Sequence, residues 1–359
     1  MPSYKIKDSE VIRTLLFYKN PGKSLLSYND DWQDAFTNES IFDIETCNLA
    51  TKKWLLYIPK IDKFDLIIFL HSSNSNGIAI HPWLAKSLTY RKGKLVFFVG
   101  NEYKLMPEKI ALIKKINADF IVSQLPQDTA EWLYEDCESS KTISLPHALN
   151  PFVFNSEVCF ENRPIDIGIR SFEYPKYLGD TDRNIILKLS DHQSLKSLCT
   201  DIETKKSKRL DRQGWAHFLG NCKSTFSNEA GTSYLEKDDR TRKAVNAHMS
   251  DHPEASSKEI YNLFFKNYSS PVSGKCISSR HFDAIGTKTC QIMFPGRFND
   301  ILKPDEHYLS LNRDFSNLDN VLERFNDVSY SRKMVNETYE YVIDSHTHNH
   351  RIKKLLNLI

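Results

Sequence analysis

Apolar runs alternate with helical patterns through the first half of the chain. Apolar runs typical of strands lie at residues 53–58, 65–70, 94–99, 119–123 and 142–145. Helical spacing occurs at residues 107–116, which begin with a proline, and at residues 127–136. Strands that are apolar throughout and are separated by helices favour a parallel sheet covered on both faces.

Prolines interrupt this pattern at Pro146, Pro151 and Pro164, and we place a domain boundary there. The alternation then resumes, with apolar runs at residues 165–170, 183–188, 223–227, 289–294 and 307–311. Helices are predicted at residues 211–219, 257–266, 318–325 and 331–344.

The pattern therefore predicts an α/β protein with two Rossmann-like domains that face each other across a cleft. We expect an N-terminal, acceptor-side domain at residues 1–152 and a C-terminal, donor-side domain at residues 153–340. Residues 341–359 would form a C-terminal helix that packs back on the N-terminal domain, because residues 351–359 are apolar on one side.

Composition narrows the class of function. The 359 residues include 48 Lys+Arg and 46 Asp+Glu, and a net charge of +2 gives no strong field for nucleic acid. Seven cysteines without a C-x-x-C pair indicate free thiols in a reducing cytosol. No stretch approaches the roughly 20 apolar residues of a membrane span. We expect a cytoplasmic protein, and a membrane-attached substrate remains open.

The most informative segment runs from residue 277 to residue 294. It predicts a loop, a short helix with Arg280, His281 and Asp283, a turn at Gly286 and a buried strand. A basic side chain at a helix start suits a diphosphate, and both oxygens of Asp283 can accept hydrogen bonds from a ribose diol. A helix cap with a surface ion pair is the alternative.

Polar loops follow two other predicted strands. Glu229 stands beside Gly231 and Thr232, where small residues let the backbone approach a ligand and the carboxylate can act as acid or base. His71 follows residues 65–70 and is a candidate general base. A turn with a solvated Glu and a polar loop with a capping histidine are the alternatives.

Glu102 and His147 also follow predicted strands and would face the cleft, unless they belong to an exposed loop and a linker. The alternating histidines at positions 346, 348 and 350 suit a metal or a polar helix junction. The charge run at residues 205–209 suggests a solvated face, although Arg209 and Arg212 are placed to reach a phosphate. Dinucleotide and P-loop glycine motifs are absent.

Residues 166–351 resemble the C-terminal domain of GT-B glycosyltransferases, in particular the bacterial spore-maturation-type (group 1-like) enzymes. The resemblance rests on QGWAHFL at 213–219, NEAG at 228–231, SSRHFDA at 278–284 with Gly286, KPDEHY at 303–308 and DFSNL at 314–318. The N-terminal half matches more loosely, through FVGNEYK at 98–104 and LPHALN at 145–150.

The resemblance implies a hexosyl or related transferase that needs neither metal nor cofactor. It would move a sugar from a nucleotide-sugar donor to a hydroxyl of a glycan or lipid-linked glycan, in bacterial surface polysaccharide synthesis and at the inner face of the membrane. In the family, an Arg-x-Phe-Glu-Ala-type helix holds the donor nucleotide. We expect donor contacts from Arg280, His281, Asp283, Arg170, Gly231, Thr232 and Ser279, and catalytic or sugar contacts from Glu229, His147, His71 and Glu102.

Two departures from the family pattern stand out. Asp283 occupies the position of a Glu, which shortens the side chain by one methylene. Many retaining relatives have a second Glu where this chain has Lys275, so the carboxylate pair is absent and Glu229 is a hypothetical replacement. A non-catalytic nucleotide-sugar or glycan-binding protein is the alternative function, and a phosphorylase or epimerase on the same fold is another.

Overall fold

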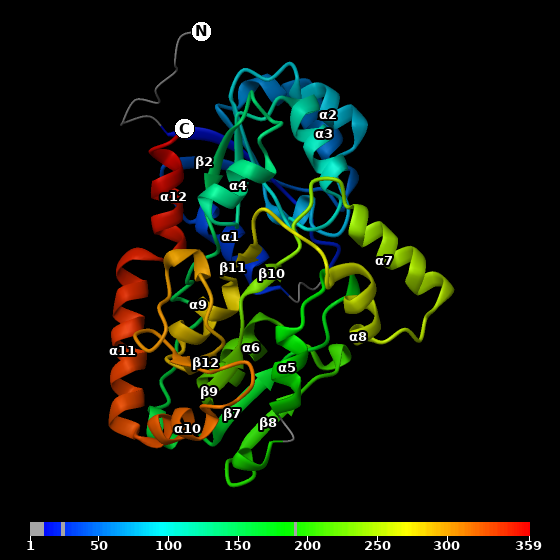
Figure 1. The fold of residues 1–359 in the computed structure, drawn as a ribbon. Coiled ribbons are helices and arrows are strands. Elements are labelled where there is room, and N and C mark those ends of the chain that lie inside the picture. Colours follow the sequence, from blue (N-terminus) through cyan, green and yellow to red (C-terminus); the bar gives the residue numbers. More distant parts are fainter. Residues whose placement is uncertain (1–10, 23–25, 190–191) are drawn as a thin grey trace.

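The computed structural model describes residues 11–22, 26–189 and 192–359, and in them the chain forms two parallel sheets, one in each half (Figure 1). The N-terminal sheet has the strand order β2-β1-β3-β4-β5-β6. Its strands are β1 (Ile12–Tyr18), β2 (Phe42–Asn48), β3 (Leu66–Phe69), β4 (Lys94–Phe98), β5 (Phe120–Ser123) and β6 (Lys141–Ser144).

Both faces of the N-terminal sheet are buried. Phe69 and Phe97 pack on one face with α2 (Pro82–Leu88), α3 (Met106–Ile116) and α4 (Gln127–Leu133). Phe98 lies on the other face with Trp32 of α1 (Ser27–Thr37) and Ile352 of α12 (His348–Leu356). Side chains alternate between faces along a strand, so continuous apolar runs fill both cores.

The C-terminal sheet has the strand order β13-β12-β9-β7-β8. Its strands are β7 (Ile165–Arg170), β8 (Thr200–Glu203), β9 (Cys222–Ser227), β12 (Cys290–Met293) and β13 (Leu309–Ser310). The helices of this half are α5 (Asp182–Lys188), α6 (Arg212–Gly220), α9 (Ser279–Gly286), α10 (Leu318–Asn326) and α11 (Val328–Ser345). Ile292 packs with Val321 on one face, and Phe282 packs with Val342 on the other.

An insertion interrupts the second half between β9 and α9. The antiparallel strands β10 (Ala230–Thr232) and β11 (Gly274–Cys276) form its base. Between them lie α7 (Arg240–Asp251), α8 (Ser257–Ile260) and the π-helical turn η8 (Tyr261–Phe265), which project from the side of the molecule (Figure 1).

The chain passes between the two halves at two adjacent segments. The backbone N–H of Leu149 donates to the carbonyl of His346 at 2.9 Å, and that of His348 donates to the carbonyl of Leu149 at 3.2 Å. Arg351 Nε donates to the carbonyl of Pro146 at 3.1 Å. The tail histidines therefore take part in a junction, and no group of side chains in the described residues is arranged to hold a metal ion.

Two apolar runs expected to be strands are helical. Residues 53–58 lie in the 3-10 helix η1 (Lys52–Lys63), because β2 already occupies the sheet edge and only Trp54 of this run is buried. Residues 183–188 lie in α5, where helical spacing buries Arg183 and Ile186. The pattern also left β1, β2, β8, β10, β11, α1, α2 and α7 unpredicted.

Candidate functional site

A cleft of about 400 Å³ lies where the carboxyl ends of the two sheets face each other. The N-terminal half lines it with the start of α1 and the loops that follow β3, β4, β5 and β6. The C-terminal half lines it with the loops that follow β7, β8 and β9 and with the start of α9. Ligands of open α/β sheets bind at this edge of the strands.

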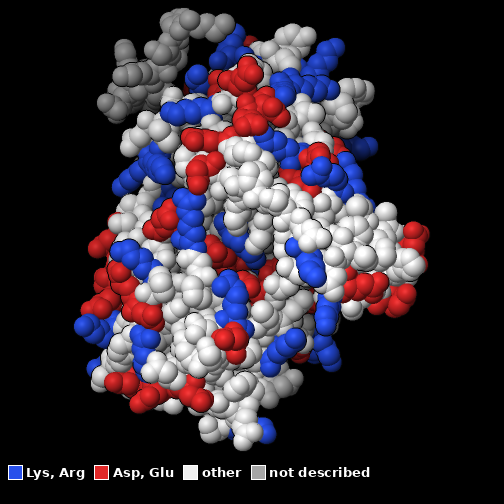
Figure 2. All heavy atoms as spheres, in the orientation of Figure 1, with Lys and Arg blue, Asp and Glu red and all other residues white. Residues whose placement is uncertain are grey.

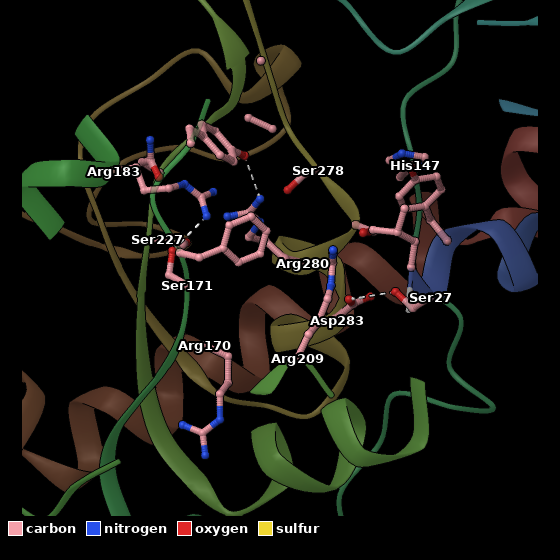
Figure 3. A pocket seen from close by; sticks show the side chains of 18 of the residues that line it. Ser27, His147, Arg170, Ser171, Arg183, Arg209, Ser227, Ser278, Arg280 and Asp283 are labelled. Atoms are coloured by element: carbon pink, nitrogen blue, oxygen red, sulfur yellow. Dashed lines mark hydrogen bonds between the residues drawn. The ribbon is translucent and has the colours of Figure 1, made fainter. Parts of the chain in front are cut away.

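The cations that line the C-terminal wall include three arginines: Arg183, Arg209 and Arg280 (Figure 3). None of them forms an ion pair with a carboxylate among the described residues. Arg280 Nη2 donates to Tyr174 Oη at 3.0 Å, and the guanidinium of Arg183 lies 3.6 Å from the centroid of the same ring. Such clustered cations suit an anionic ligand.

Arg183 is the most deeply buried of the three, with 3% of its surface exposed. Its Nη1 donates to Ser171 Oγ at 2.8 Å, whereas Nε and Nη2 have no hydrogen-bond partner among the described residues. Burial, together with the neighbouring charge of Arg280, lowers the pKa of Arg183 to about 10, so the side chain still carries its charge at neutral pH. Its unpartnered donors face the cleft and are free for a ligand.

The start of α9 is held by His281, which is fully buried. His281 Nδ1 accepts from the backbone N–H of Ser278 at 3.0 Å, and Nε2 lies 3.2 Å from the carbonyl oxygen of Asn228. Burial, with a contribution from Arg280, lowers the pKa of His281 to about 3. The neutral ring therefore fastens the helix to the loop after β9, and Ser279 and Arg280 line the cleft instead.

Asp283 lines the cleft and connects its two walls. Its Oδ2 accepts from Trp215 Nε1 at 2.9 Å and from Ser27 Oγ, which belongs to α1, at 3.4 Å (Figure 3). Burial raises the pKa of Asp283 well above its ordinary value, and nearby Asp31 adds to the shift. The expected contact with a ribose stays a prediction.

Further buried polar atoms beside the arginines lack partners. They are Ser227 Oγ and Asn228 Nδ2, and both residues line the cleft. Gly231, with φ of +85°, lies next to them, and a Cβ there would come within 2.1 Å of the Gly274 carbonyl oxygen. Buried polar groups normally have partners, so this part of the cleft is arranged for a polar ligand.

The opposite wall carries amide and aromatic side chains: Tyr28, Asn76, Asn101, Tyr103 and Gln124. His147 lies among them, with its ring centroid 4.3 Å from that of Tyr28. Its Nδ1 accepts from Trp32 Nε1 at 3.0 Å, and an indole N–H can only donate. Burial, with help from His71 and His348, lowers the pKa of His147 well below its ordinary value. The neutral ring therefore carries its proton on Nε2.

His71 and Glu102 differ in their position relative to this wall. His71 is 1% exposed, lies behind His147 outside the cleft, and has no partner at either ring nitrogen. Glu102 lines the cleft, but its carboxylate accepts from Ser123 Oγ at 2.6 Å, Tyr134 Oη at 2.7 Å and the backbone N–H of Gln124 at 2.9 Å. Burial raises the pKa of Glu102. It thus ties together the loops after β4 and β5.

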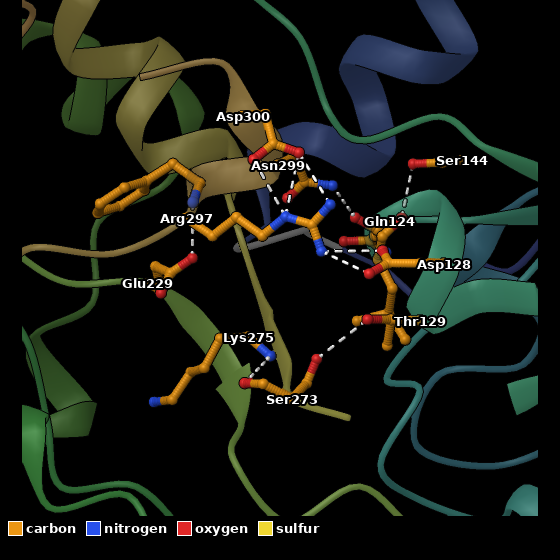
Figure 4. Close-up of polar contacts among 12 residues, drawn as sticks. Gln124, Asp128, Thr129, Ser144, Glu229, Ser273, Lys275, Arg297, Asn299 and Asp300 are labelled. Carbon is orange, nitrogen blue, oxygen red and sulfur yellow. Dashed lines mark hydrogen bonds and ion pairs between the residues drawn. The ribbon is translucent and has the colours of Figure 1, made fainter. Parts of the chain in front are cut away.

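Two residues expected at the donor site, Arg170 and Thr232, and the expected catalytic residue Glu229 have their side chains directed to other parts of the protein. The guanidinium of Arg170 pairs with Asp201 at 2.7 Å and points away from Arg183 and Arg280 (Figure 3). Glu229 lies outside the cleft lining, and its Oε1 accepts from the backbone N–H of Phe298 at 2.7 Å (Figure 4). Thr232 donates to the carbonyl of Leu178 at 2.9 Å.

Polar contacts also connect the two domains beside the cleft (Figure 4). Arg297 Nη1 donates to both oxygens of Asp128, at 2.8 and 2.9 Å. Asn299 Nδ2 donates to the carbonyl of Gln124 at 2.9 Å. The turn that carries these residues has left-handed backbone at Phe298, Asn299 and Asp300, and Glu229 binds it. Glu229 therefore supports the turn that bridges the domains.

Arg183 was missed by sequence reasoning, because residues 183–188 were expected to form a strand. The available signal was the cation in the first turn of a short helix, directly after the loop that follows β7. Arg209 and Arg212, at and just after the end of a charge run, were expected to be placed to reach a phosphate: both line the cleft, but Arg212 pairs with Asp31 and Asp34. No helix in the described part of the chain is long and apolar enough to cross a membrane.

Comparison with known proteins agrees with this architecture. Residues 211–357 match the model of a family described as glycosyl transferase-like. No curated protein matches the chain in sequence. The crystal structure of Anabaena HepE with UDP and glucose has a TM-score of 0.56 at 8% identity, and the match covers 97% of this chain and 100% of that one.

Sucrose-phosphate synthase from Thermosynechococcus elongatus also has a TM-score of 0.56, at 12% identity, over 97% of this chain and 98% of that one. HepE with bound UDP-glucose has a TM-score of 0.53 at 7% identity, over 97% and 100%. These likenesses confirm the GT-B fold that was predicted. The fold and the family match over residues 211–357 support a transferase, and the spore-maturation group stays a prediction.

Proposed function

Because the chain has the GT-B fold of glycosyltransferases, we propose that it transfers a sugar from a nucleotide-diphosphate donor to a hydroxyl of a glycan acceptor. The cluster of Arg183, Arg209 and Arg280 beside the start of α9 carries this proposal, since these cations have no carboxylate partner in the described residues. The complexes of HepE with UDP and with UDP-glucose support a donor of the same class.

The donor wall would act mainly on the leaving group. As the glycosidic bond breaks, negative charge develops on the diphosphate, and preformed cations and helix N-termini stabilise it. Arg183 and Arg280 would bind the phosphates, and Asp283 would accept from the ribose. Ser227 Oγ and Asn228 Nδ2 would bond to the phosphates or the sugar, because both are buried without partners.

The acceptor wall would recognise a neutral glycan. Amide and tyrosine side chains such as Asn101, Gln124 and Tyr103 offer hydrogen bonds and ring faces, as sugars require. His147 would donate its Nε2–H to a sugar oxygen. Glu102 accepts three hydrogen bonds from the protein, so it would position the wall and not act as a base.

We propose that no metal is needed, because the three guanidinium groups supply the positive charge that a divalent ion would bring. Transfer should then persist in the presence of EDTA, and loss of activity with EDTA that is restored by a divalent ion would reject this point. We also propose that the protein acts where nucleotide sugars are made, on the cytoplasmic side of surface polysaccharide synthesis.

The test is a screen of nucleotide sugars and free nucleotides for thermal stabilisation, followed by assays of transfer and donor hydrolysis. A bound nucleotide at many times its Kd should stabilise the protein by a few kcal/mol. Arg280→Ala should raise the donor KM and lower kcat. Unchanged donor kinetics in that variant would reject the site, and binding without turnover would favour a non-catalytic nucleotide-sugar-binding protein.

A further inference from the structure

Large apolar side chains are exposed on two adjacent elements of the N-terminal domain, η1 and α2, which we call the η1–α2 face. Four of the ten exposed large apolar side chains lie on η1 or on α2 and the turn after it: Leu55, Leu56, Trp83 and Tyr90. The last three are 68%, 65% and 69% exposed. Scattered single residues of this kind are ordinary, but a group on adjacent elements marks an interaction surface.

Ring contacts hold η1 and α2 side by side. Trp54 of η1 stacks on His81 with ring centroids 4.8 Å apart, and His81 contacts Trp83 at 5.3 Å. Trp83 lies in the first turn of α2, and Tyr90 lies in the turn that follows the helix. Leu84 and Leu88 bury one side of α2 in the core.

Exposed lysines lie on the same two elements, η1 and α2. Lys52, Lys53, Lys63 and Lys86 are exposed and form no ion pair with any described residue. Figure 2 shows Lys and Arg side chains among uncharged ones over the upper right of the molecule, where α2 lies, with acidic side chains gathered beside them. The whole chain has a net charge of only +2, so the excess of positive charge is local to this face.

We propose that this η1–α2 face docks on an anionic lipid bilayer. Tryptophan and tyrosine favour the boundary between water and lipid, and leucine enters the acyl region. Each lysine close to an anionic surface contributes about a fivefold gain in affinity, so four lysines together contribute several hundredfold. Neither set of side chains anchors a protein firmly alone, but the two together do.

The chemistry of the face favours lipid over protein. Protein interfaces are enriched in arginine and depleted in lysine. On this face, the exposed cations without an ion pair among the described residues are lysines. The face also belongs to the domain that forms the acceptor wall, because β3 connects η1 to the loop carrying Asn76. Docking would bring this wall close to an acceptor attached to lipid, although docking itself does not depend on the proposed function.

Co-sedimentation with vesicles tests the proposal. The full-length protein should sediment with vesicles of equal parts phosphatidylglycerol and phosphatidylcholine, and weakly or not at all with phosphatidylcholine alone. Raising the ionic strength should weaken binding. The variant Lys52→Gln/Lys53→Gln/Lys86→Gln should lose affinity by about a hundredfold, since three contributions of about fivefold are removed.

Two matched variants control for surface changes elsewhere. Leu56→Ser/Trp83→Ser should lose binding, whereas Leu263→Ser, which removes an exposed apolar side chain from the insertion, should bind as wild type. Lys196→Gln/Lys258→Gln, which removes two exposed lysines from the other domain, should also bind as wild type. Nucleotide binding should be equal in all variants and reports on folding.

Two results would overturn the proposal. One is wild-type protein that ignores both kinds of vesicle, or face variants that bind as well as wild type. The other is a face that pairs two copies of the chain, seen as a dimer in size-exclusion chromatography that Leu56→Ser/Trp83→Ser converts to a monomer while vesicle binding is absent.

Discussion

Arg183 should be required for nucleotide binding and yet be dispensable for the stability of the ligand-free protein. It is 3% exposed, and its Nε and Nη2 have no hydrogen-bond partner among the described residues. Removing an arginine from a buried ion pair normally costs about 3–5 kcal/mol of stability, because a buried charge loses its partner. Arg183 has no such pair among the described residues, so Arg183→Met should behave differently.

The magnitude follows from the contacts of the guanidinium. Two buried N–H groups without partners each cost about 1–3 kcal/mol. The contact with the Tyr174 ring contributes about 1–2 kcal/mol, and the hydrogen bond to Ser171 contributes about 1 kcal/mol. Because the two groups together cost about 2–6 kcal/mol and the two contacts contribute about 2–3 kcal/mol, Arg183→Met, which keeps an unbranched side chain, should change the free energy of unfolding by between a loss of about 1 and a gain of about 4 kcal/mol. A lost hydrogen bond to a charged phosphate is worth about 1.5–3 kcal/mol, or about a 10- to 100-fold loss of nucleotide affinity.

Urea unfolding of the ligand-free protein and calorimetric titration with the nucleotide found in the ligand screen measure the two effects. Arg170→Met is the matched control, because Arg170 pairs with Asp201 and points away from the other arginines, so it should lose little affinity. A variant at position 183 that is destabilised by more than about 3 kcal/mol would show that Arg183 is a structural residue. Unchanged nucleotide affinity would remove it from the donor site.

Three other predictions follow from the same contacts. Trp32→Phe removes the N–H that donates to Nδ1 of His147. Nitrogen NMR of the His147 ring should then change from protonated Nε2 to a mixture of tautomers, and kcat should fall severalfold. An unchanged spectrum would disprove the assignment of the proton to Nε2. Because the folded pKa of His71 is about 3 and the unfolded one is about 6.5, the unfolded state binds more protons between these pH values and stability falls with decreasing pH. His71→Phe should therefore gain stability relative to wild type by up to about 1.4 kcal/mol per pH unit below about pH 6.5, as measured by urea unfolding, and a constant difference would contradict this. Glu229→Gln keeps an acceptor for the N–H of Phe298 and should retain activity within about threefold, whereas Glu229→Ala should lose more; complete loss in the Gln variant would indicate that Glu229 takes part in catalysis.

The sequence was sufficient to predict the strands that are buried on both faces. Strands β3, β4 and β5 are apolar at nearly every position, and no other arrangement buries them so completely. Short amphipathic pieces were harder, because three or four apolar residues fit a strand or one turn of a helix equally well. That is why η1 and α5 were expected to be strands: neighbouring strands and helices decide between the two states.

Part of the candidate site was predictable for a similar reason. A helix start placed Arg280 and Asp283 at the cleft edge, a position after a strand placed Glu102 and His147 there, and the structure brings them to one cleft. The sequence could not tell which polar atoms the protein itself uses. Both ring nitrogens of His281, for example, contact backbone groups of its own domain. Direction and partners of a side chain depend on tertiary contacts that no local pattern contains.

The distribution of charge across the cleft constrains how the two domains work together. Arginines without an ion pair among the described residues line the C-terminal wall, whereas no arginine or lysine lines the described N-terminal wall, so a bound diphosphate should gain its stabilisation from one domain. In the proposed function, the other domain would then carry the acceptor hydroxyl to the donor. Asp283 accepts from Trp215 in its own domain and from Ser27 in the opposite one, so a ribose that binds this carboxylate acts on the contact between the walls. If the chain acts as proposed, donor binding and the approach of the acceptor wall should therefore be coupled through Asp283.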